Sequence, residues 1–154
     1  MLDTTFALAL HILGAVVWVG GMFTAYLCLR PAAGALEGPQ RLQLWRGFFA
    51  KFFIWVWVSI LLLLGSGYWL MLTAFGGFKG APLYVNLMQS LGIVMVLLFV
   101  WLFHGPWLKF KRAVDAKDWP AAAGHIGLIA KIIQVNLPLG LIVVIIGGTG
   151  RFWG

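Results

Sequence analysis

Charged residues are scarce in this chain, and their scarcity excludes an ordinary water-soluble domain. Only 10% of the 154 residues are charged, whereas 62% are hydrophobic. A soluble globular domain carries about 25% charged residues, because its surface must stay hydrated. We therefore expect an integral membrane protein whose apolar surface faces the lipid bilayer.

Cysteines and acidic residues are also few, which excludes several kinds of site. The single cysteine, Cys28, rules out an internal disulfide and a metal site built on paired cysteines, and we expect it to be a packed thiol. None of the four acidic residues lies inside a long apolar stretch, so a proton relay of buried carboxylates is excluded. The net charge of +7 is concentrated in two connections rather than in one stripe, so nucleic acid is not an expected partner.

Long apolar stretches dominate what remains. About 20 helical residues span the ~30 Å hydrocarbon layer of a membrane, and only a helix or a closed barrel satisfies its backbone hydrogen bonds there. The stretches predict an all-α, integral membrane four-helix bundle forming a single domain over residues 1–154. The expected helices are approximately 4–29, 52–76, 82–108 and 120–150.

Basic residues predict the orientation of this bundle. Positively charged loops stay in the cytoplasm, and the second connection carries only Lys79. Both termini are therefore expected on the periplasmic side of a bacterial inner membrane (N-out/C-out). The basic residues of the first and third connections are Arg30, Arg41, Arg46, Lys51, Lys109, Lys111, Arg112, Lys117 and Lys131.

The first expected helix carries a stripe of small and polar residues with alternating spacings of four and three. Such a heptad-like stripe follows one helix face, and small residues let a neighbouring membrane helix approach closely. This face, and His11 with it, is therefore expected to point into the bundle. The stripe consists of Ala7, His11, Gly14, Trp18, Gly21, Ala25 and Cys28.

An ionisable residue inside a membrane helix is a candidate functional residue. His11 lies about seven residues, or ~10 Å, below the outer surface. Ser66 and Tyr68 of the second helix, and Asn86 and Gln89 of the third, are expected at the same depth. These side chains predict a periplasm-facing site formed by His11, Tyr68, Asn86 and Gln89.

Methionine sulfur atoms near this layer suggest that the site binds a metal ion. Imidazole and thioether together suit copper, particularly Cu(I), so His11, Met22 and Met88 are the candidate metal ligands. Imidazole alone suits an axial ligand of haem b. A bis-histidine haem is not predicted, because His104 and His125 lie toward the opposite membrane surface. The alternative is a polar layer in which His11 only hydrogen-bonds Asn86 or Tyr68.

Several segments resemble a known family. Residues 10–22, LHILGAVVWVGGM, are similar to the opening helix of CopD-like (copper resistance D) membrane proteins, with a histidine followed by Trp-x-Gly-Gly. The chain as a whole resembles the small four-span branch of that family and is also similar to HemJ-type proteins. The later segments that carry the resemblance are Arg30-Pro31, Ser66-Gly67-Tyr68-Trp69, Leu87-Met88-Gln89 and Gly150-Arg151-Phe152.

The resemblance implies copper binding or transport at the periplasmic face, with His11 as the ligand that matches the family's first-helix histidine. Its HemJ-like side implies a haem-binding redox protein instead. A third hypothesis is an accessory structural subunit, because a small chain with short loops suits packing in a homo-oligomer or a larger membrane protein complex.

Overall fold

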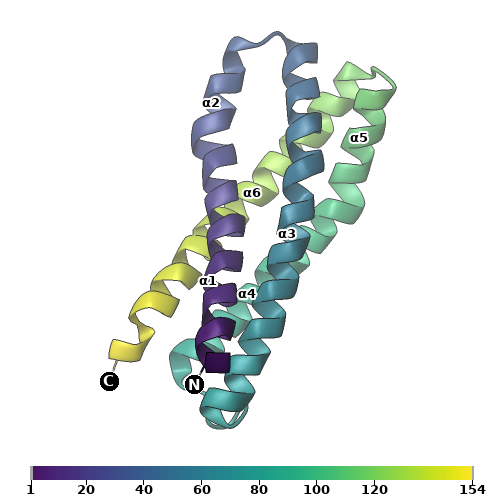
Figure 1. Cartoon of the computed structure of the whole chain (residues 1–154). Coiled ribbons are helices and arrows are strands. Elements are labelled where there is room, and N and C mark those ends of the chain that lie inside the picture. The colour runs from purple at the N-terminus through teal and green to yellow at the C-terminus, as the bar shows by residue number, and fades with distance from the viewer. Residues whose placement is uncertain (1, 154) are drawn as a thin grey trace.

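The computed structural model describes residues 2–153, which form helices joined by short turns. Within these residues four helical segments are long and apolar enough to cross a membrane, which confirms the all-helical fold with four apolar helices. Figure 1 shows both chain ends at one end of the bundle, here called the terminal end; the opposite end is called the basic end. The four segments are Leu2–Ala35, Gly38–Phe75, Leu83–Asp115 and Trp119–Phe152.

Three of the four segments are composite. The second is a single helix, α3, whereas the others change their hydrogen-bonding pattern along their length. The elements are α1 (Leu2–Phe23), the π-helix η1 (Thr24–Leu29), α2 (Arg30–Ala32), the 3-10 helix η2 (Ala33–Ala35), α3 (Gly38–Phe75), α4 (Leu83–Leu102), the π-helix η3 (Phe103–Trp107), α5 (Leu108–Asp115), α6 (Trp119–Thr149) and the 3-10 helix η4 (Gly150–Phe152).

Local signals explain where several helices begin and end. Gly76 ends α3 in the left-handed conformation with φ of 68°, which glycine adopts without steric cost. The Asp118 carboxylate accepts a hydrogen bond from the Ala121 amide at 3.1 Å and caps α6. By contrast, α3 begins at Gly38 rather than near residue 52, because its first turns bury Leu42 and Trp45 against the core.

Two prolines in the basic half, Pro31 and Pro106, lie next to or within π-helical turns. Pro31 follows η1, and Pro106 lies inside η3. Proline lacks an N–H donor and its ring crowds the preceding turn, so the wider π-turn lets the first segment continue past Pro31 instead of ending at residue 29. The extra residue in this turn also rotates the helix face. Cys28 is consequently exposed, and the prediction of a packed thiol is wrong.

Glycines set the close contacts between the helices. A Cβ on Gly14 of α1 would lie 3.2 Å from the Ser59 carbonyl oxygen of α3, so these two backbones approach closely. A Cβ on Gly140 of α6 would lie 2.9 Å from Val19 of α1 and 3.1 Å from Met95 of α4. Helix α6 therefore crosses α1 and α4 at this glycine, as the diagonal path of α6 in Figure 1 shows.

Candidate functional site

His11 lies half-buried on the face of α1 that packs against α3. Its Nδ1 atom lies 3.0 Å from the hydroxyl oxygen of Ser66 on α3. Ser66 itself is only 8% exposed, so this polar contact belongs to the interior of the helix pair. The expectation that the small-residue stripe turns His11 toward a neighbouring helix agrees with this arrangement.

The direction of this hydrogen bond follows from counting protons. A serine hydroxyl has one proton to donate and two lone pairs that accept, and Ser66 donates its proton to the Leu62 carbonyl oxygen. When Ser66 donates to Leu62, its oxygen is left to accept from His11, and this arrangement favours the neutral imidazole that carries its proton on Nδ1. The lone pair of the ring is then on Nε2.

Gly67 makes room for this ring on the surface of α3. A Cβ at this position would lie 3.1 Å from Cε1 and 3.4 Å from Nδ1 of His11, closer than such atoms normally pack. The ring edge formed by Cε1 and Nδ1 of His11 therefore packs directly against the backbone of Gly67. Ser66 therefore provides the polar contact of the His11 side chain, and Gly67 provides the space for its ring.

The other residues of the predicted layer fall into separate contacts. Tyr68 faces α4, where its hydroxyl oxygen lies 3.5 Å from Nε2 of Gln89, and its ring packs 6.2 Å from that of Phe78. Asn86 donates to the carbonyl oxygens of Ala81 and Pro82, just before α4 begins. The structure thus pairs Tyr68 with Gln89. Tyr68, Gln89 and Asn86 do not hydrogen-bond His11. The predicted partners of His11 are replaced by Ser66.

The two predicted methionine ligands also lie elsewhere. Met22 is 2% exposed in the core, and the 11 residues that separate it from His11 on one helix correspond to roughly 16 Å. The Met88 sulfur packs against α6, 3.0 Å from where a Cβ on Gly147 would lie. Met22 therefore cannot share a metal ion with His11, and the contact of Met88 is with Gly147.

His11 is the only imidazole in the predicted set, and the structure gives it a hydrogen-bond partner on one ring nitrogen. Within residues 2–153, no three His, Cys, Asp or Glu side chains are grouped to hold one. His104 hydrogen-bonds the Val100 carbonyl oxygen of its own segment at 2.9 Å, near the basic end. In metal-binding histidines generally, one ring nitrogen binds the metal and the other donates a hydrogen bond to a neighbouring group.

Two features of the molecule escaped sequence reasoning. Ser66 was placed in the polar layer but not in the site, although a helical serine that donates to the carbonyl four residues earlier keeps an accepting oxygen. A groove at the basic end, lined by Arg30 and Arg41, was also missed. Its signal was the pair of arginines, Arg30 and Arg41, on either side of the glycines at positions 34 and 38.

Comparison with models of protein families, with curated proteins and with solved structures finds no match to this chain.

Proposed function

We propose that this chain is a copper-handling protein of the bacterial inner membrane, and that copper contacts Nε2 of His11 near the periplasmic side. The proposal is supported by the four apolar helices and by the resemblance of residues 10–22 to the opening helix of CopD-like proteins. The observation that carries it is the hydrogen bond from His11 Nδ1 to Ser66, which leaves the Nε2 lone pair for a ligand.

An anchored imidazole of this kind suits a soft or borderline metal ion. Imidazole binds copper, and a partner on the other nitrogen fixes the orientation of the ring and raises its basicity. Ser66 supplies this partner from α3, while Gly67 lets the ring approach. Residues of this chain therefore hold and orient one donor atom, and copper is the cargo rather than a resident cofactor.

A single protein ligand has consequences for how copper would be held. Binding through one donor is weak and reversible, because the remaining coordination positions stay open to other donors. Such a site suits transfer of copper between donors better than storage. The remaining ligands would come from a second chain, from a carrier that delivers or accepts the ion, or from small molecules.

The proposal is tested by anaerobic titration of the purified protein, in lipid nanodiscs, with Cu(I) in competition with a chromophoric Cu(I) chelator. We expect the protein to take up at most one copper ion per chain while the chelator is scarce, and an excess of the chelator to remove this ion, because one donor binds weakly. An optical spectrum of the protein as purified is recorded first. A Soret band would favour the haem-binding alternative, and failure to compete for copper, with a colourless protein, would favour the accessory-subunit alternative.

The proposed orientation places both termini in the periplasm. It rests on the nine basic residues named above, which lie in the basic half of the molecule, and on the common position of the two chain ends in Figure 1, because positively charged regions beside membrane helices stay in the cytoplasm. Alkaline phosphatase, which is active only in the periplasm, should be active when fused after residue 154 and inactive when inserted after residue 116. The opposite pattern would reverse the orientation and place His11 on the cytoplasmic side.

A further inference from the structure

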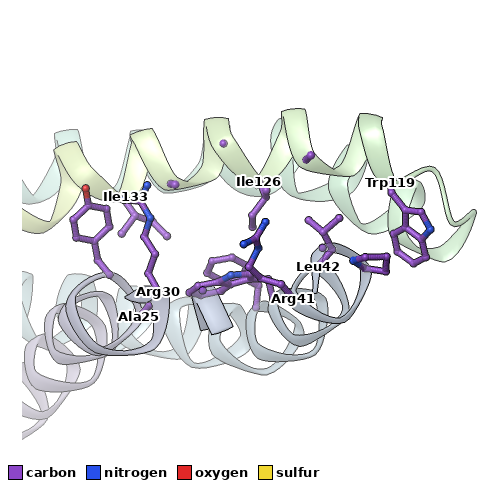
Figure 2. Close-up of a pocket in the computed structure, with 16 residues that line it drawn as sticks. Ala25, Arg30, Arg41, Leu42, Trp119, Ile126 and Ile133 are labelled. Atoms are coloured by element: carbon purple, nitrogen blue, oxygen red, sulfur yellow. The ribbon is translucent and has the colours of Figure 1, made fainter. Parts of the chain in front are cut away.

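A groove of about 540 Å³ lies at the basic end of the molecule, between the α2–α3 region and the first half of α6. This volume is in the range of small-molecule sites in proteins. Its walls include Arg30 of α2, Arg41 and Trp45 of α3, and Trp119, Ile126 and Ile133 of α6. Figure 2 shows Arg30 and Arg41 projecting from one wall toward α6, and Ile126 and Ile133 projecting from the other.

The groove carries positive charge without a neutralising carboxylate. No aspartate or glutamate is among its lining residues, and within residues 2–153 neither Arg30 nor Arg41 forms an ion pair. Arg46 differs, because its guanidinium binds the Asp115 carboxylate through two contacts of 3.3 Å. Gly38 and Pro39 also line the groove, so the partial positive charge at the start of the 38-residue α3 adds to that of the arginines.

Apolar and aromatic side chains form the rest of the walls. Trp45 and Ile133 are buried beneath the groove, and the ring of Tyr26 lies under the Arg30 guanidinium at 5.0 Å. Apolar residues continue beyond the groove, with Leu27 50% exposed on η1 and Val135 55% exposed on α6. The occupant that matches this surface has an anionic head and an apolar tail.

We propose that the groove binds the phosphate headgroup of an anionic glycerophospholipid, whose acyl chains follow the apolar faces of η1 and α6. Basic pockets between membrane helices bind such headgroups. Along α6, Arg30 lies opposite Ile133 and Arg41 opposite Ile126, two turns or ~10 Å apart. A lipid with two phosphates is therefore expected to bind more tightly than a lipid with one. This site is distinct from His11 and does not depend on copper.

Native mass spectrometry of the delipidated protein, titrated with single lipids, tests the proposal. Cardiolipin, with two phosphates, should bind more tightly than phosphatidylglycerol, and phosphatidylcholine should bind weakly. The double variant R30Q/R41Q should lose about 30-fold in cardiolipin affinity, at ~1 kcal/mol per arginine. The matched control K109Q/K111Q removes the same charge from exposed positions outside the groove and should bind cardiolipin like the wild type.

A second variant tests the groove while keeping both arginines. Ala123→Glu places a carboxylate at an exposed position of the groove wall, and it should also weaken cardiolipin binding without changing phosphatidylcholine binding. The proposal would be overturned if R30Q/R41Q and K109Q/K111Q lost cardiolipin affinity equally. It would also be overturned if neither R30Q/R41Q nor Ala123→Glu lost cardiolipin affinity. Displacement of cardiolipin by an equal concentration of inorganic phosphate would show that the site recognises a soluble anion and not a lipid.

Discussion

Replacing His11 with alanine is expected to weaken Cu(I) binding by at least ~100-fold. The substitution removes the only donor atom that the proposed site takes from this chain, and loss of a mere supporting residue already costs 10–100-fold in metal affinity. Affinities of wild type and variant are compared by anaerobic competition with a chromophoric chelator. Because His11 is half-buried at the α1–α3 contact, the helical content of the variant is measured by circular dichroism alongside.

The other two histidines provide matched controls for this result. His104→Ala and His125→Ala remove imidazoles near the basic end, far along the bundle from His11, and should leave copper affinity unchanged. Loss of binding in these variants as well would indicate nonspecific coordination by histidine. Undiminished Cu(I) binding in a folded His11→Ala variant would show that His11 is not the copper ligand.

The role of Ser66 in orienting His11 can be tested separately from the role of His11 as the copper ligand. Ser66→Ala removes the acceptor that holds Nδ1 and should lower copper affinity by about 10- to 100-fold. Ser90→Ala is the control, because Ser90 also donates to the carbonyl four residues earlier, at 2.8 Å, but contacts no histidine. Equal behaviour of the two serine variants would show that the Ser66 contact does not orient the ligand.

The second large effect is expected in the aromatic core of the basic half. Phe53 of α3 is 2% exposed and packs with ring centroids 4.9 Å from Phe49, 5.4 Å from Phe99 and 5.2 Å from Trp107. Its contacts join α3 to α4 and η3. Phe53→Ala should reduce the free energy of unfolding by about 3 kcal/mol. This is the low end for such truncations, because lipid gives little hydrophobic drive between helices and mainly packing is lost.

Unfolding of the variants is followed by near-ultraviolet circular dichroism in mixed detergent micelles of increasing sodium dodecyl sulfate content. The neighbouring Ile54 offers the control, because its side chain is 63% exposed on the outer face of the same helix. Ile54→Ala should change the free energy of unfolding by less than about 0.5 kcal/mol. Comparable losses in the two variants would show that the helices do not pack around Phe53.

The sequence predicted the long helices well because hydropathy reports directly on length and composition. The end of the second helix at residue 76 was also predicted correctly, since Gly76 ends α3 through its own left-handed turn. The π-turn before Pro31 was not readable, because a proline after an apolar run predicts a helix end as readily as a wider turn. The exposure of Cys28 follows from that turn.

The site was only partly predictable, for a different physical reason. Counting residues places side chains at a depth in the bundle, but it does not show which helix each side chain faces. Helix α1 packs along α3, and α4 packs along α6, so His11 meets Ser66 whereas Asn86 binds carbonyl groups at its own helix start. Neighbour relations between helices depend on contacts such as that of Gly140 with Val19, and the hydropathy pattern does not contain them.

The protonation state of the His11 ring is the feature on which the copper proposal depends. Nitrogen-15 NMR of protein labelled at histidine distinguishes the two neutral imidazole forms, and the His11 signals are assigned by their loss in a His11→Gln variant. We expect a proton on Nδ1, and a shift of the Nε2 resonance when Cu(I) is added. A proton found on Nε2 in the neutral ring, with no response to copper, would contradict the copper proposal.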